Sequence, residues 1–149
     1  MVLTWQLNLG GEKMNIHQYQ HKVQYYETDK MGMVHHSNYI RWFEEARTDY
    51  LEALGLPYEQ MEAEGIGSPV LSVQCQYKSK VVYGETVTIQ VSLKSYSGLR
   101  MSLVYMVTGS DGKVRCTGET DHCFINQSGR PVILTKVKPD WDLLFRQQL

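Results

Sequence analysis

The chain has 149 residues, 42% hydrophobic and 21% charged, with a formal net charge of -1 at pH 7. This length suits one domain with its own core, and the near-neutral balance without a basic cluster excludes a chain built to bind nucleic acid. No apolar run approaches the ~18 residues that a membrane span needs. Three cysteines, Cys75, Cys116 and Cys123, form no CxxC pair, which indicates free thiols in a cytoplasmic protein.

Residues 1–13 come before a second methionine, Met14, at which the patterned part of the chain begins. The GGE run just ahead of Met14 can be encoded by a purine-rich sequence of the ribosome-binding type. We hypothesise that Met14 is the native start and that residues 1–13 are a translated leader. The alternative is a disordered N-terminal arm. In both cases residues 14–149 form a single domain.

The first regular elements are a strand and a long helix. Residues 17–27 partly alternate between apolar and polar side chains, which predicts a strand. From about Ser37 to Leu54, apolar side chains recur at steps of three and four residues, which predicts an amphipathic helix. Ser37 or Asn38 is placed to cap this helix, and Gly55 is placed to end it.

The remaining pattern is one short helix, several strands and a terminal helix. The short helix is expected over residues 58–65. The strand-like runs and the terminal helix are expected at residues 69–78, 85–97, 100–110, 113–126 and 139–148. This order predicts one α+β domain with a helix packed on an antiparallel meander. A lone helix leaves sheet edges open, so we expect a homo-oligomer, with Tyr105 and neighbouring apolar residues on a surface that a second copy covers.

The segment DKMGMVHH, between the first strand and the long helix, carries more chemistry than a connecting loop needs. His36 lies at the first turn of the helix, where free backbone N–H groups and the helix dipole suit a developing oxyanion. Gly32 permits a positive φ or a close approach of a ligand. The carboxylate of Asp29 can act on a bound carbonyl as nucleophile or as general base for water. The arrangement therefore predicts an acyl-transfer or hydrolysis site.

Plain structural explanations stay open for the same residues. An aspartate in a turn commonly caps that turn, and His36 can be an ordinary residue at a helix start. Glu44 and Glu45 fit the solvated face of the helix. A metal site built from the adjacent histidines has no supporting ligand spacing, so we expect no metal and no redox cofactor.

The run YYETDKMGMVHHSNYIRWFEEARTDYLEALGLPYEQMEAEGI resembles the N-terminal half of the hotdog-fold acyl-CoA thioesterases of the 4-hydroxybenzoyl-CoA thioesterase type. The shared pattern consists of an aromatic strand, T-D-x-x-G-x-V, a histidine pair, N-Y and F-E-x-A-R. A weaker similarity continues to about residue 134. The resemblance implies a long central helix wrapped by a curved antiparallel sheet of about five strands. It also implies dimers or tetramers with the active site between subunits.

Carried over residue by residue, the resemblance makes Asp29 the catalytic carboxylate and His36 the residue whose N–H polarises the thioester carbonyl. The substrate-binding positions that it implies are Gly32, Val34, His35, Tyr39, Glu44, Lys78, Lys80 and Arg100. Glu44 matches a helix acid that contacts the acyl group in members acting on hydroxylated aromatic substrates. The three basic residues are candidates for the phosphates of coenzyme A, which is part of the substrate and no separate cofactor.

Two other functions are compatible with the same fold. A hotdog hydratase or dehydratase also pairs an acid with a histidine, but it carries a proline-containing D-x-N-P-x-H-like turn that DKMGMVHH lacks. A catalytically silent module would bind acyl-CoA without turnover. In another branch of the fold the catalytic carboxylate is a glutamate on the long helix, which keeps Glu44 or Glu45 as an alternative to Asp29.

Overall fold

The computed structural model describes residues 5–9 and 12–149. A six-stranded antiparallel sheet has the strand order β1-β2-β4-β5-β6-β3. The strands are β1 Trp5–Leu9, β2 Glu12–Lys22, β3 Val70–Tyr77, β4 Thr86–Tyr96, β5 Arg100–Thr108 and β6 Val114–Cys123. The helices are the 3-10 turn η1 Tyr25–Glu27, then α1 Ser37–Ala53, α2 Tyr58–Ala63, α3 Leu134–Val137 and α4 Pro139–Arg146.

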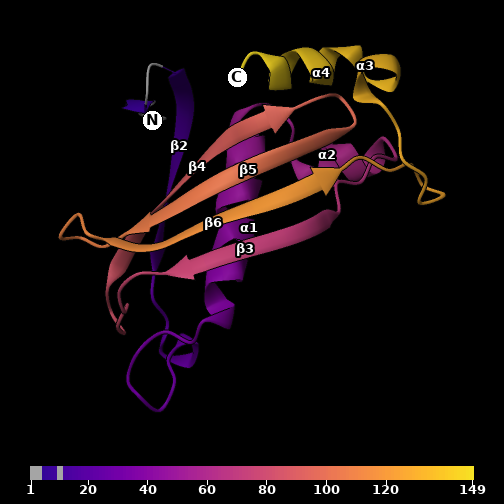
Figure 1. Cartoon of the computed structure of the whole chain (residues 1–149). Coiled ribbons are helices and arrows are strands. Elements are labelled where there is room, and N and C mark those ends of the chain that lie inside the picture. Colours follow the sequence, from indigo (N-terminus) through magenta and orange to yellow (C-terminus); the bar gives the residue numbers. More distant parts are fainter. Residues whose placement is uncertain (1–4, 10–11) are drawn as a thin grey trace.

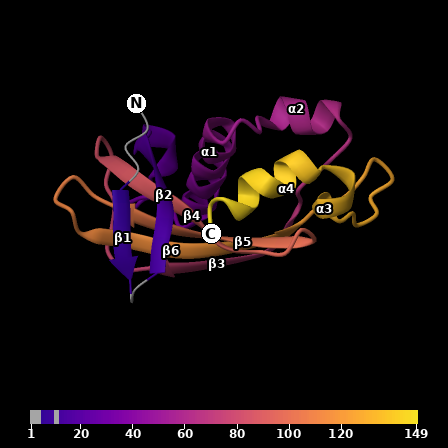
Figure 2. The same cartoon turned by 90° about the horizontal axis from the view of Figure 1, so that it is seen from above.

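The predicted α+β arrangement is confirmed. Figures 1 and 2 show α1 lying across one face of a curved sheet, with α2 and α4 on the same side. Strands β2 to β6 form the expected five-stranded sheet, and β1 extends it beyond β2. Of the range 1–13, residues 1–4 and 10–11 lie outside the described part, so the leader or arm stays a prediction. Within that range the structure describes Trp5–Leu9 as a strand paired with β2.

Two predicted boundaries are wrong for local reasons. The first strand ends at Lys22 rather than at residue 27, because the Glu27 side chain accepts a hydrogen bond from the Gln24 N–H at 2.8 Å and closes η1. The helix is capped at His36 rather than at Ser37 or Asn38, and His36 makes no side-chain capping bond. The end of the helix is as predicted, since Gly55 follows it with φ +88°.

The core lies between α1 and the sheet. Trp42, Phe43 and Ala46 recur at helical spacing and are completely buried against the inward side chains of β4 and β5. The Phe43 ring stacks on Tyr105 of β5, with ring centroids 4.4 Å apart. Gly118 of β6 makes room for this stack, because a Cβ at that position would overlap the Phe43 ring. Apolar burial of this size is the main source of stability.

This packing overturns the expectation for Tyr105. Its side chain is only 3% exposed and faces α1, so a second copy cannot cover it.

The Tyr105 hydroxyl begins a chain of buried polar groups. It accepts a hydrogen bond from Arg47 Nη1 at 3.1 Å and lies 2.7 Å from Thr120 Oγ1. Thr120 Oγ1 is in turn 2.8 Å from His122 Nε2. Burial, with a contribution from the nearby Arg47 charge, lowers the pKa of His122 to about 4.

None of the helices in residues 5–9 and 12–149 is both long and apolar enough to cross a membrane.

Because the His122 imidazole stays neutral in the folded protein, we expect stability to fall as the pH falls. The unfolded chain binds a proton here near pH 6.5, whereas the folded protein resists protonation down to about pH 4. The free energy of unfolding should therefore decline by roughly 3 kcal/mol across this interval, at about 1.4 kcal/mol per pH unit. Urea unfolding at fixed protein concentration, repeated from neutral to acidic pH, measures the slope.

The His122→Gln variant cannot titrate at this position and serves as the control. Its stability should decline less steeply over the same pH interval. Equal slopes in the two proteins would contradict a neutral His122 in the folded state.

Candidate active site

The loop between η1 and α1 is a closed turn. Thr28 and Val34 form an antiparallel bridge across its base. Inside the turn, the Asp29 N–H donates to the Met33 carbonyl at 2.8 Å, and the Gly32 N–H donates to the Asp29 carbonyl at 3.1 Å. Gly32 has φ +76°, a left-handed conformation that favours glycine. The sequence folds this way locally because glycine permits the reversal and the bridge closes it.

The two oxygens of the Asp29 carboxylate have different surroundings. Its Oδ1 accepts the Met31 N–H at 2.8 Å, so the turn-capping explanation is correct for this oxygen. Its Oδ2 makes no hydrogen bond within the described residues. The side chain is half-buried. One oxygen therefore fixes the orientation of the group while the other remains available for chemistry.

Asp29 lines an open groove of about 720 Å³. The lining residues come from η1, the loop and the first turns of α1: Tyr25, Tyr26, Thr28, Asp29, Lys30, His35, Ser37, Asn38 and Arg41. The groove therefore combines a carboxylate with two cations and two exposed aromatic rings. Such a mixture fits a substrate that has both polar and apolar parts.

The start of α1 follows the loop directly. The His36 N–H donates no hydrogen bond to any described residue, whereas the Asn38 N–H is used by the His35 carbonyl at 3.0 Å. The His36 carbonyl accepts a hydrogen bond from the Tyr77 hydroxyl at 3.0 Å. The rings of His36 and Tyr77 also meet edge to face. His36 therefore offers a free N–H at the positive end of α1, and Tyr77 of β3 holds it in place.

The structure brings some of the predicted substrate-binding residues together. Val34 and Tyr39 are buried in the hydrophobic core. The Val34 N–H donates to the Val81 carbonyl at 2.8 Å, which ties the loop to the chain after β3. Lys78 and Lys80 are exposed on that same segment.

Two other predicted residues lie apart from Asp29 within one chain. Arg100 begins β5 and pairs with Cys123, at the opposite end of the sheet from Tyr77, which pairs with Cys116. Glu44 is exposed on α1 and faces a different groove, about 570 Å³ in volume.

The alternative carboxylate on the helix, Glu45, is already engaged. Its Oε2 is 2.9 Å from His21 Nδ1 and accepts the Tyr19 hydroxyl at 3.2 Å. These contacts tie α1 to β2. Asp29 makes no such tie to a strand: it lies in the loop before α1, and its Oδ2 bonds to none of the described residues.

Sequence reasoning missed Tyr77 and Glu27. Tyr77 lies 41 residues from His36 in the chain, so no local pattern signals their hydrogen bond. Glu27 was read as the end of a strand, but it is buried and bonded to the Trp42 indole. The one available signal was its place directly before the Thr28-Asp29 pair.

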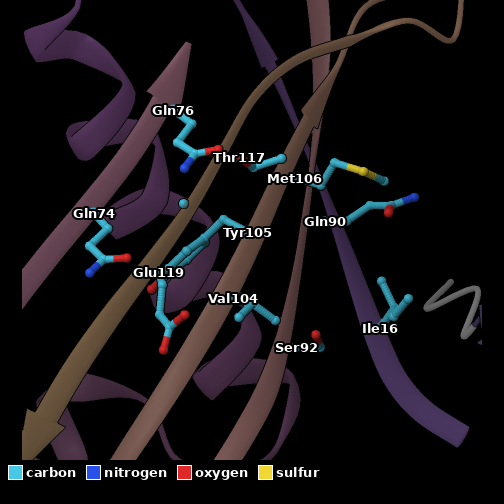
Figure 3. Close-up of a pocket in the computed structure, with 11 residues that line it drawn as sticks. Ile16, Gln74, Gln76, Gln90, Ser92, Val104, Tyr105, Met106, Thr117 and Glu119 are labelled. Carbon is cyan, nitrogen blue, oxygen red and sulfur yellow. The ribbon is translucent and has the colours of Figure 1, made fainter. Parts of the chain in front are cut away.

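A separate hollow of about 390 Å³ lies on the sheet face that carries no helix among the described residues (Figure 3). Amide side chains such as Gln74 and Gln90 line it together with Val104 and Met106. Its carboxylate, Glu119, is paired with Lys94 at 3.0 Å. The hollow contains neither a free helix N-terminus nor an unengaged acid, so we place the candidate site at Asp29. Within residues 5–9 and 12–149, no three His, Cys, Asp or Glu side chains are placed to hold a metal ion.

Comparison with known proteins shows the family to which the chain belongs. The sequence profile of a family described as the thioesterase-like superfamily matches residues 23–144. A Bacillus subtilis (strain 168) protein described as "Putative acyl-CoA thioesterase YneP" is 32% identical over 135 residues, which cover 90% of this chain and 98% of that protein. A 4-hydroxybenzoyl-CoA thioesterase from Pseudomonas sp. (strain CBS-3) is 28% identical over 80 residues, 52% of this chain and 57% of that protein.

The fold has a similar counterpart among crystal structures. A DHNA-CoA thioesterase from Staphylococcus aureus superposes with a TM-score of 0.86 at 35% sequence identity, covering 89% of each chain. The resemblance drawn from the loop and helix motifs is therefore confirmed, and so is the hotdog fold that it implied.

We predict that Tyr77→Phe loosens the start of α1. The variant loses the hydrogen bond to the His36 carbonyl but keeps the aromatic packing against Tyr39. A hydrogen bond of this kind contributes about 1 kcal/mol, so the amides of residues 38–40 should exchange about fivefold faster. Hydrogen exchange followed by mass spectrometry measures the change. Tyr83→Phe is the control, because Tyr83 is exposed and its hydroxyl bonds to none of the described residues; equal exchange in both variants would refute the role of Tyr77.

Proposed function

The chain belongs to the thioesterase-like superfamily, and from that premise we propose that it hydrolyses acyl-CoA thioesters with Asp29 and the helix start at His36. As predicted, the enzyme is an acyl-CoA thioesterase, the activity named for its relatives. One observation carries the assignment of residues. The Asp29 carboxylate is oriented by one oxygen and free at the other, directly before a helix with an unpartnered N–H.

The proposed mechanism uses both groups on one thioester. The carbonyl oxygen accepts the His36 N–H, and the positive end of α1 stabilises the negative charge that develops there. Asp29 either attacks the carbonyl carbon, which expels the coenzyme A thiolate and leaves a mixed anhydride for water to cleave, or removes a proton from the attacking water. Both routes give the free acid and coenzyme A. Neither requires a metal or a redox cofactor.

The remaining substrate contacts are assigned by position. Gly32 and His35 border the reacting carbonyl, and the exposed Lys78 and Lys80 are available to the phosphates of coenzyme A. Arg100 lies at the opposite end of the sheet, and Glu44 lines a different groove from Asp29 of the same chain. In our proposal they act at a site shared with a second copy.

Strand β3 is the surface that we propose for this second copy. It forms the sheet edge opposite β1, so one side of its backbone is unpaired within the described structure. Its apolar side chains Val70, Leu71, Val73 and Tyr77 are exposed. An exposed apolar edge strand favours pairing with another chain. We infer a dimer or tetramer, and from the free cysteines a reducing cytoplasmic environment.

The Asp29 assignment is tested by following free-thiol release from short, long and aromatic acyl-CoAs. We expect turnover by the wild type and a loss of at least ~100-fold in Asp29→Asn, because the amide can neither attack nor accept a proton. Equal activity in both proteins would move the carboxylate elsewhere, with Glu44 next in line. A wild type that releases no thiol would favour a hydratase or a silent acyl-CoA-binding module.

The role of β3 is tested with Val73→Lys. A charge on the edge strand should convert the oligomer to a monomer in sedimentation experiments and lower turnover by at least about tenfold. Leu143→Lys is the control, since Leu143 is exposed on α4, away from this edge. A monomeric Val73→Lys with full activity would refute a site shared between subunits.

A further inference from the structure

Glu27 is a buried carboxylate that the proposed reaction does not use. It ends η1, two residues before Asp29, and is only 4% exposed. A carboxylate removed from water is destabilising unless hydrogen bonds replace its hydration. The partners of Glu27 therefore indicate why a charge is kept at this position.

The side chain of Glu27 joins three separate parts of the chain. Its Oε2 accepts the indole N–H of Trp42, in α1, at 2.6 Å. Its Oε1 accepts the Gln24 backbone N–H at 2.8 Å and lies 2.7 Å from His21 Nε2, at the end of β2. These hydrogen bonds hold the η1 turn against both the central helix and the neighbouring strand.

The backbone of Glu27 holds the far end of the loop. Its carbonyl accepts the His35 N–H at 2.9 Å and Asn38 Nδ2 at 2.9 Å. The loop thus begins after Glu27 and is closed by the hydrogen bond from His35 to the Glu27 carbonyl, with Asp29 between the two residues. Any displacement of Glu27 moves the Asp29 carboxylate relative to the helix start.

The charge of Glu27 is maintained by its surroundings. Burial alone would raise the pKa of Glu27, but its hydrogen bonds, led by the one from the Gln24 N–H, lower the pKa below the ordinary value. His21 lies between Glu27 and Glu45, so both of its ring nitrogens face carboxylate oxygens. The hydrogen bonds to Glu27 therefore offset part of the cost of burying its charge.

We propose that Glu27 is a positioning residue for thioester hydrolysis, which holds the Asp29 carboxylate and the His36 N–H in a fixed arrangement. The proposal rests on the function proposed above. Glu27 does not line the groove, so it acts through the loop and touches no reacting atom. A rigidly held loop matters because small displacements of reacting groups lower the rate strongly.

Glu27→Gln is the direct test. An amide NH₂ replaces one carboxylate oxygen, so the side chain can no longer accept hydrogen bonds from both the Gln24 N–H and the Trp42 indole N–H. We expect kcat for acyl-CoA hydrolysis to fall by about 10- to 100-fold while KM changes by less than about threefold, because binding persists and the reacting groups are misplaced. Amide hydrogen exchange in residues 28–36 should become at least about fivefold faster.

Asp142→Asn is the matched control. Asp142 is also a buried carboxylate with three hydrogen bonds, from Tyr96 at 2.7 Å, Thr135 at 2.9 Å and Arg146 at 2.9 Å. It belongs to α4, at the opposite end of the sheet from the loop (Figure 1). Asp142→Asn should lower stability while kcat stays within about twofold and exchange in residues 28–36 is unchanged.

The double variant Glu27→Gln/Asp29→Asn tests the coupling. Because Glu27 acts by placing Asp29 against the His36 N–H, the loss of kcat in the double variant should be smaller than the product of the two single losses. Multiplied effects would overturn the proposal. Wild-type activity in Glu27→Gln, or equal losses of kcat in Glu27→Gln and Asp142→Asn, would overturn it as well.

Failure of the proposed function is distinguishable from failure of this inference. A wild type that hydrolyses no acyl-CoA overturns the function, and the exchange comparison still decides whether Glu27 holds the loop.

If Glu27→Gln does not fold, Trp42→Phe removes only the helix-side hydrogen bond and keeps an aromatic ring in the core. A lower kcat with unchanged KM in Trp42→Phe supports the proposal, and unchanged kcat overturns it.

Discussion

The packing of the apolar face of α1 into the curved sheet is the interaction on which the rest of the structure depends. Trp42, Phe43 and Ala46 are fully buried there, and each large side chain stabilises the fold by about 2–3 kcal/mol through its removal from water. The stack of Phe43 on Tyr105, opposite Gly118, sets how closely the helix approaches the sheet. Because α1 is held in this way, the position of its first turn is also set, and the site is built at that turn.

Polar contacts on both sides of α1 complement this apolar packing. Toward the sheet, Arg47 is buried and bonds to Tyr105. Toward the loop, Trp42 bonds to Glu27. Buried hydrogen bonds are directional, and a buried polar group without its partner is destabilising, so such contacts favour one rotation of the helix over others. The N-terminus of the helix is therefore held next to the loop in a single orientation.

Local patterns were sufficient for the longer helices, for strands β2 to β6 and for the turn around Asp29. Helix α1 was predicted to within a residue, because its apolar repeat and Gly55 are both short-range signals. The 3-10 turn η1 and the short helix α3 were missed, since neither has a repeat long enough to show a period. The Glu27 side chain ended the first strand early through contacts with residues of other elements. Tyr105 was misplaced because an aromatic residue in an alternating strand can face either side of a sheet.

By itself, the sequence determined the α+β class, the family and the chemical groups at the candidate site, because helical period, turn glycines and the T-D-x-x-G-x-V motif all act over a few residues. Only the tertiary structure decided which groups meet. It placed Tyr77 against the His36 carbonyl, left one oxygen of Asp29 free, and separated Arg100 from the loop by the length of the sheet. The physical reason is that these relations depend on strand register and on the packing of α1, which join residues dozens of positions apart.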